Sequence, residues 1–209
     1  THDVQHLRAD IALQNGGDLE SRRCSVEDEV EALKHADILI SIQSEEERVF
    51  ARLFPEKRHV VCGHAISKFP VRAAGTKTKK VLFVGNRYDP NTRGIQAFIR
   101  EVWPAVVRQV SDATLEVVGT VCRDLSKETA GVQLHGFVPD VKPFYESAAV
   151  VVNPVAYGSG QKVKSIEALA LGKCLVLTPA GRQGLPATIP CVETGLDSMA
   201  GVLVDLLMH

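Results

Sequence analysis

The sequence has 209 residues, of which 45% are hydrophobic, and it carries a formal net charge of −1. This length and composition allow one large domain, or one domain with part of another, and they permit a sizeable core. The near-neutral charge gives no basis for a nucleic-acid partner, and no apolar run approaches the roughly 18–20 residues that span a bilayer.

The first third of the chain alternates helix and strand signals. Ser25 can cap an amphipathic helix, and residues 37–42 and 59–62 are strand-like. Between these strands, Ser44 and Glu47 match a capping box that would open a second helix. These elements are too few for a complete doubly wound domain, so we predict a partial α/β domain here.

Two histidines near the start of the chain, His2 and His6, are four residues apart. This is a metal-ligand spacing on a helix, but no third ligand is evident nearby. We therefore predict no metal site.

The composition changes over residues 67–80, which include Pro70, Gly75 and a cluster of lysines. Low apolar content with clustered charge is typical of an interdomain linker. We therefore divide the chain into the partial domain with its linker, residues 1–74, and a second domain, residues 75–209.

The second domain alternates strands and helices along its whole length. After a strand at 81–84 and Gly85, a polar loop leads into a helix that runs to about residue 110 and that Pro104 should kink. Such alternation calls for a parallel sheet with right-handed crossovers, so we predict an α/β fold with a doubly wound, Rossmann-like sheet. Further strands are expected at 115–118, 132–135, 148–152, 175–178 and 191–193.

A glycine loop follows the buried strand at 148–152. Gly158 and Gly160 can let backbone N–H groups converge on an anion. The helix expected after them, from about residue 162, is stopped by Gly172. A helix N-terminus behind a glycine loop is suited to phosphate.

The polar residues of that helix sharpen the prediction. Lys164 and Glu167 are three residues apart and share a face, with Ile166, Leu169 and Ala170 expected on the buried side. The lysine can meet a phosphate, and the carboxylate can accept two hydrogen bonds from a vicinal diol such as a ribose. The alternative is a surface ion pair, worth a few tenths of a kcal/mol.

Two other phosphate-binding motifs are not met. The run from Gly158 has Val163 where a dinucleotide fingerprint needs its third glycine, and no such fingerprint follows Val84, which disfavours a nicotinamide-dependent oxidoreductase. The step at Gly172 and Lys173 lacks the upstream glycine of a Walker loop, and it ends a helix rather than opening one.

A known pattern covers residues 154–185, with G-S-G-x-x-x-K-x-x-E-A-L-A-x-G-K followed by T-P-x-G-x-x-G-L. Upstream motifs continue it in order: F-V-G at 83–85, V-V-G at 117–119 and G-F-V-P-D-V at 136–141. On these motifs the chain resembles the family 4 (group 1) glycosyltransferases of the GT-B fold, and the resemblance is loose over the first third. It implies that residues 1–74 are the later part of an acceptor-side domain, and that the second domain binds a nucleotide sugar.

The resemblance implies roles for particular residues. Arg87 or Arg93 would pair with the donor diphosphate, since guanidinium binds phosphate bidentately. The family spacing R-x(n)-K-G is not kept here, so both arginines stay open. Lys164 and Glu167 would serve both catalysis and donor binding. The other donor-binding candidates are Gly85, then Gly136, Phe137 and Val138 at the nucleobase, and Gly158, Ser159 and Gly160.

Two features bear on catalysis in the resembled family. A His–Asp pair often follows a strand of the first domain and faces the cleft, which makes His2 a catalytic candidate beside Asp3; a frayed terminus is the alternative. Many members also carry a Glu, eight residues before the position of Glu167, that touches the donor hexose. Here that position is Ser159, so backbone N–H groups would have to replace a carboxylate.

We therefore expect a glycosyltransferase that moves a hexosyl group from a nucleotide-diphospho-sugar co-substrate, with no other cofactor and no metal. The resemblance implies retention of anomeric configuration. A non-catalytic nucleotide-sugar-binding module, or an inactive fragment of such an enzyme, remains the alternative.

The acceptor would be a saccharide, a lipid-linked glycan or a protein. Five scattered cysteines without a C-x-x-C pair are typical of reduced thiols in a cytosolic protein. We expect a cytoplasmic location, with peripheral association at the inner face of a membrane as an option. The chain starts without Met and ends in an amphipathic run at 197–208, so we also expect a piece of a longer protein.

Overall fold

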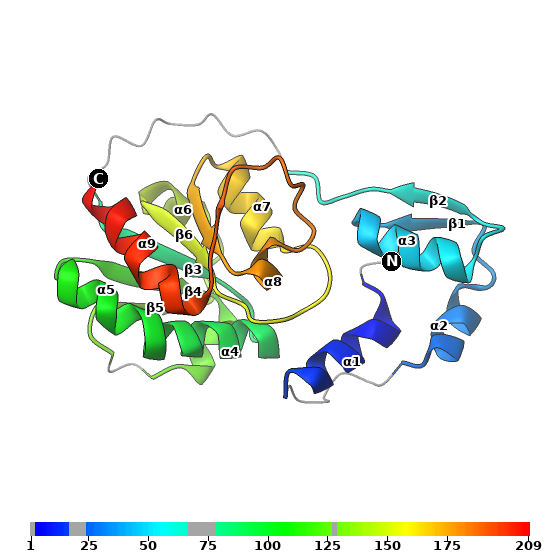
Figure 1. The fold of residues 1–209 in the computed structure, drawn as a ribbon, viewed down its shortest axis with the longest axis horizontal. Helices are drawn as coiled ribbons and strands as arrows, with labels where there is room; N and C mark the ends of the chain where they lie inside the picture. Colours follow the sequence, from blue (N-terminus) through cyan, green and yellow to red (C-terminus); the bar gives the residue numbers. More distant parts are fainter. Residues whose placement is uncertain (1–2, 17–23, 67–77, 127–128) are drawn as a thin grey trace. The chain divides into compact units, whose positions relative to one another are not determined.

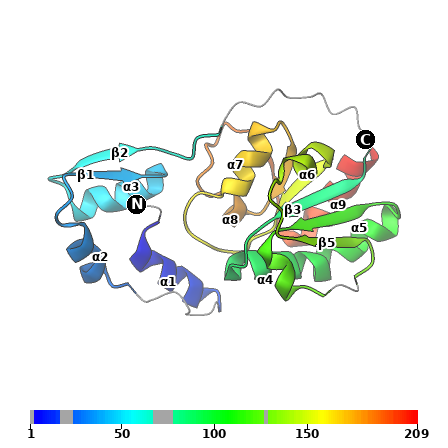
Figure 2. The ribbon, with the colours of Figure 1, turned by 180° about the vertical axis from the view of Figure 1, so that it is seen from behind.

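The computed structural model describes residues 3–16, 24–66, 78–126 and 129–209. They form two compact units (Figures 1 and 2). The first unit comprises Thr1–Ala65, Tyr157–Val163 and Gln183–Ala187, and the second comprises Ile66–Ala156, Lys164–Arg182 and Thr188–His209. His2, most of the predicted linker, and the boundary predicted between residues 74 and 75 lie outside the described residues.

The second unit is built on a six-stranded, all-parallel sheet with the order β5-β4-β3-β6-β7-β8. The chain starts at β3, builds outward to β5, and returns to the other side of β3 with β6. This is the doubly wound order, so the predicted fold class is confirmed. The strands span Lys80–Val84 (β3), Thr114–Val118 (β4), Val132–Gly136 (β5), Val150–Asn153 (β6), Cys174–Leu177 (β7) and Val192–Glu193 (β8).

Helices cover both faces of this sheet, with α4, α5 and α9 on one side and α6 and α7 on the other (Figures 1 and 2). One apolar core joins Val81 and Phe83 of β3 to Trp103 and Leu203 of the helices, all almost fully buried. Leu82 is also fully buried and alternates with them toward the opposite face. The helices span Asp89–Ala97 (α4), Trp103–Gln109 (α5), Lys142–Ser147 (α6), Val163–Ala170 (α7), Pro179–Arg182 (α8) and Leu196–Met208 (α9).

The predicted break at Pro104 takes the form of a widened turn. Between α4 and α5 the chain makes a π-helical turn, Phe98–Val102, and Pro104 lies in the first turn of α5. Proline has no N–H to donate to the preceding turn, and a π-turn shifts the hydrogen-bond pattern at that point. Within the described ranges, no helix combines the length and the apolar character needed to cross a membrane.

The first unit pairs two parallel strands, β1 (Ile38–Ser41) and β2 (Arg58–Val61), with three helices. Its core gathers Val4, Leu39, Phe50 and Phe54, each at most 4% exposed. The helices span Gln5–Gln14 (α1), Val26–Leu33 (α2) and Ser44–Leu53 (α3).

Helix ends in the first unit are held by acidic side chains. The carboxylate of Glu29 accepts from the backbone N–H groups of Gln5 and His6 at 3.0 and 3.3 Å, and lies 2.5 Å from Nδ1 of His6. The Ser25 cap is confirmed as a full capping box with Asp28. The box predicted at Ser44 is wrong: α3 is capped at the preceding residue, Gln43, whose side chain bonds Glu46 instead.

Candidate functional site

The strand order of the second unit singles out one edge of its sheet. β3 and β6 are neighbours, yet the segments that follow them turn to opposite faces, into α4 and into α7. Sheets of this type bind their ligands outside the carboxyl ends of the strands at such a switch point. The residues after β3 and β6 are therefore the first place to examine.

Glycines line the carboxyl ends of three adjacent strands. Gly85 after β3 donates to the Val118 carbonyl at 2.9 Å, and Gly119 after β4 donates to the Gly136 carbonyl at 2.6 Å. A Cβ on Gly119 would overlap the Gly85 carbonyl oxygen, and its φ of +112° is itself reserved for glycine. The edge is therefore made of backbone alone. Phe137, which follows Gly136, is 77% exposed.

Lys164 connects the two helices that diverge at the switch point. Its ammonium donates to Oδ1 of Asn91 in the first turn of α4, and lies 4.7 Å from the ring centroid of Phe83. Asn91 is buried and donates in turn to Oδ1 of Asn86 at 2.6 Å. Because Asn91 is neutral, its hydrogen bond orients the ammonium without cancelling the charge. The sequence analysis did not identify Asn91.

Glu167 lies one turn further along α7, half-buried. Its Oε2 accepts from the hydroxyl of Tyr145 at 3.0 Å, and the same hydroxyl is 3.3 Å from the Lys164 carbonyl. Tyr145 is fully buried, and burial, followed by the charge of Glu167, raises the pKa of its phenol well above the usual range. Tyr145 therefore stays a donor and fixes this carboxylate in place.

The buried side of α7 was predicted wrongly. Ser165 and Ala168 are fully buried, whereas Ile166, Leu169 and Ala170 are only partly buried. The cause is the fully buried amide of Asn153, at the end of β6, which donates to Oγ of Ser165 at 2.9 Å. A polar anchor thus decides which side of the helix faces the sheet.

The two arginine candidates have different surroundings. Nε of Arg87 lies 2.9 and 3.0 Å from the carboxylate oxygens of Asp124, and its backbone N–H donates to Oγ1 of Thr120, the residue after Gly119. Arg93 pairs along α4 with Asp89 at 2.9 Å. Arg87 is therefore fixed at the glycine edge, and Arg93 belongs to the surface of α4.

The predicted glycine loop lies in the first unit. Gly158 and Gly160 have φ values of +136° and +71°. Oγ of Ser159 between them donates to Oδ2 of Asp3 at 2.7 Å, so the residue beside His2 contacts this loop. The structure thus groups Gly85, Gly136, Lys164 and Glu167 in one unit and the glycine loop in the other. Among the described residues, no group of three or more His, Cys, Asp or Glu could hold a metal ion.

Comparison with known proteins adds a family match. A family model described as group 1 glycosyl transferases matches residues 78–206. An uncharacterized 44.6 kDa protein in the cps region of Klebsiella pneumoniae is 27% identical over 116 residues, 50% of this chain and 30% of that protein.

Solved structures match over both units. A TarM mutant of S. aureus, in complex with Fondaparinux, alpha-GlcNAc-glycerol and UDP, is 13% identical with a TM-score of 0.74, over 100% of this chain and 43% of its own. HepE of Anabaena, in complex with UDP and glucose, is 14% identical with a TM-score of 0.63, over 83% and 54%. At these identities the matches show the GT-B fold alone. The chain covers less than half the length of the Klebsiella protein and of TarM.

Proposed function

The chain belongs to the group 1 glycosyl transferases, and from this premise we propose that it binds a nucleotide-diphospho-sugar and takes part in sugar transfer to an acceptor. The observation that carries the proposal is the arrangement on the first turns of α7. There Lys164 bonds Asn91 of α4, and Glu167 is fixed by Tyr145. A cation for phosphate and a carboxylate for ribose hydroxyls, on one helix face at a switch point, suit a nucleoside diphosphate.

We assign the phosphates to Lys164 and to Arg87. Arg87 is preferred to Arg93 because its backbone is tied to the glycine edge by Thr120, and because guanidinium can engage two phosphate oxygens together. The backbone groups from Gly136 onward, at the end of β5, would meet the edge of the nucleobase.

We propose further that transfer retains the anomeric configuration and needs no metal. Two cationic side chains beside the glycine edge can neutralise a departing diphosphate, an electrostatic role in which the protein supplies the compensating charge. No metal-dependent step is then required.

This makes a simple prediction about chelation. The affinity for the best nucleoside diphosphate, measured by isothermal titration, should be the same in excess EDTA and in millimolar Mg²⁺ or Mn²⁺. A nucleoside, which has no phosphates for a metal to bridge, serves as the control ligand. Nucleotide binding that appears only with the divalent ion would contradict the metal-free proposal.

The nucleotide can be identified by a thermal-shift screen. The complexes of TarM and HepE contain UDP, so we expect UDP to stabilise this protein more than GDP, ADP or CDP. A ligand at a hundred times its Kd adds about 2.7 kcal/mol, which corresponds to a rise of roughly 5–10 °C in Tm. If none of the four shifts Tm, the donor-binding proposal fails.

A non-catalytic nucleotide-sugar-binding module is the second candidate. Ser159 stands where many family members carry a carboxylate that touches the donor sugar, and its hydroxyl is engaged with Asp3. Turnover of a radiolabelled donor separates the two candidates: the enzyme releases the nucleoside diphosphate and glycosylates an acceptor, whereas the module binds the donor without consuming it.

The acceptor side follows from the relatives more than from this chain. TarM was solved with a saccharide, and the Klebsiella relative lies in a cps region. We propose a role in glycan biosynthesis with a saccharide or lipid-linked acceptor. We also propose a cytoplasmic location, at the inner face of a membrane where the acceptor is lipid-linked.

A further inference from the structure

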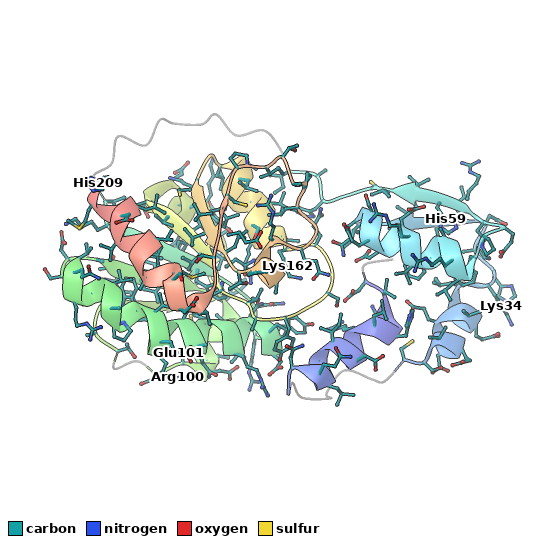
Figure 3. All side chains as sticks on the ribbon, in the orientation of Figure 1. Lys34, His59, Arg100, Glu101, Lys162 and His209 are labelled. Atoms are coloured by element: carbon teal, nitrogen blue, oxygen red, sulfur yellow. The ribbon has the colours of Figure 1, made fainter. Side chains whose placement is uncertain are left out.

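One buried lysine in the glycine loop has no part in the assignments above. Lys162, labelled in Figure 3, belongs to the first unit and precedes α7. Its ammonium donates to the Ser159 carbonyl at 3.0 Å and to the Gly160 carbonyl at 2.9 Å. The lysine thus holds two successive peptide groups of the loop by their oxygens.

The direction of the carbonyls fixes the direction of the N–H groups. The peptide unit is planar, and none of the bonds in the structure is cis, so each N–H points away from the carbonyl of its own unit. The N–H groups of Gly160 and Gln161 therefore point away from Lys162. In the described part of the chain neither has a backbone acceptor, although Gly160 is buried. A buried N–H without an acceptor is costly, which favours an acceptor from outside the chain.

The charges around Lys162 explain how an ammonium is kept in this place. The carboxylates of Asp3, ahead of α1, and of Glu46, in α3, both act on it, and Arg8 of α1 acts on Asp3. Burial lowers the pKa of Lys162 to about 8 against the pull of these two carboxylates, and burial raises the pKa of each carboxyl group. The lysine is therefore charged at neutral pH and titrates just above it.

We propose that Lys162 is a positioning residue of the donor site. By drawing the carbonyls of Ser159 and Gly160 to itself, it turns the N–H groups of Gly160 and Gln161 toward the nucleotide as a pair of donors for the diphosphate. Successive N–H groups at a left-handed glycine make such an anion-binding nest. The inference rests on the proposed function, because the anion is the diphosphate of the sugar donor.

Isothermal titration with UDP and with uridine tests this in the wild-type protein and in Lys162→Met. The substitution should weaken UDP roughly 10-fold and leave uridine unchanged, since two oriented donors to a charged group are lost. Lys173→Met is the matched control, because the Lys173 ammonium also donates to two backbone carbonyls, at 2.8 and 3.2 Å, but at the start of β7. It should leave both affinities unchanged. Equal UDP affinity in Lys162→Met and wild type would overturn the inference.

The pH profile separates positioning from a merely structural role. The wild-type Kd for UDP should rise as the pH passes about 8, where Lys162 loses its proton. Lys162→Arg should bind UDP at pH 7 without that rise, because guanidinium does not titrate there. Asp3, Glu46 and Arg8 are present in both proteins, so their contributions cancel in the comparison. A rise that persists unchanged in Lys162→Arg would overturn the inference even where Lys162→Met fails to fold.

Amide NMR makes failure of the inference distinguishable from failure of the proposed function. UDP should shift the amide signals of Gly160 and Gln161 in wild type and not in Lys162→Met. If wild type binds UDP without shifting them, the positioning role is wrong and the donor site stands. If wild type binds no nucleoside diphosphate at all, the proposed function itself fails and the inference with it.

Discussion

Replacing Glu167 with Gln is expected to weaken binding of the preferred nucleoside diphosphate by about 10- to 150-fold. A hydrogen bond to a charged group contributes roughly 1.5–3 kcal/mol, and the amide retains only part of the acceptor capacity that a ribose diol would use. Stability should change little, because the Gln oxygen can still accept from the Tyr145 hydroxyl, which now bonds Oε2 of Glu167. Isothermal titration and a melting curve on the same preparation measure both quantities.

Tyr145→Phe is the matched control for this substitution. It keeps the carboxylate of Glu167 but removes the hydroxyl that fixes it, so we expect a loss smaller than that of Glu167→Gln. If Glu167 were only a surface partner of Lys164, affinity would stay at the wild-type value and melting would fall slightly. Unaltered affinity in Glu167→Gln would remove the ribose assignment.

The sheet of the second unit could be predicted because each strand carries its own signal. Parallel strands covered on both faces are short continuous apolar runs, and those predicted around Val81, Leu115 and Val150 all belong to the sheet. Alternation with helices then restricts the topology to few choices. The signal lies within each segment, so no knowledge of distant contacts was needed.

The contacts that build the candidate site could not be predicted in this way. Lys164 and Asn91 are 73 residues apart, and Ser159 and Asp3 are 156 apart. A single sequence offers no local pattern that pairs such residues. Lys164 could be chosen because a cation near a helix start behind a glycine loop has its own chemical meaning, whereas Asn91 acquires a meaning only beside Lys164.

Periodicity failed where a polar contact outweighed apolar packing. The larger side chains of α7 favoured a buried side at Ile166 and Leu169, but Ser165 is the residue turned inward, because Asn153 on β6 donates to it. Small residues also let the helix approach the strand closely, as Ala168 does with no exposed surface. The prediction weighed hydrophobicity and had no term for a buried amide that needs a partner.

Lys164→Ala is expected to weaken UDP by about 100-fold while uridine affinity changes by less than about threefold. Only the diphosphate has the charge that an ammonium attracts, so the ratio between the two ligands reports the assignment independently of any general damage. Some damage is expected: Oδ1 of the buried Asn91 loses the donor that Lys164 supplies, at a cost of about 1–3 kcal/mol in the free energy of unfolding.

Arg93→Ala is the control for loss of a positive charge, because Arg93 pairs with Asp89 along the surface of α4 and should leave the UDP affinity near wild type. Arg87→Ala should resemble Lys164→Ala in selectivity, with a smaller loss, since its guanidinium is also shared with Asp124. A lysine that only braced α7 against α4 would weaken UDP and uridine equally when removed. Equal losses for the two ligands in Lys164→Ala would therefore place the diphosphate elsewhere.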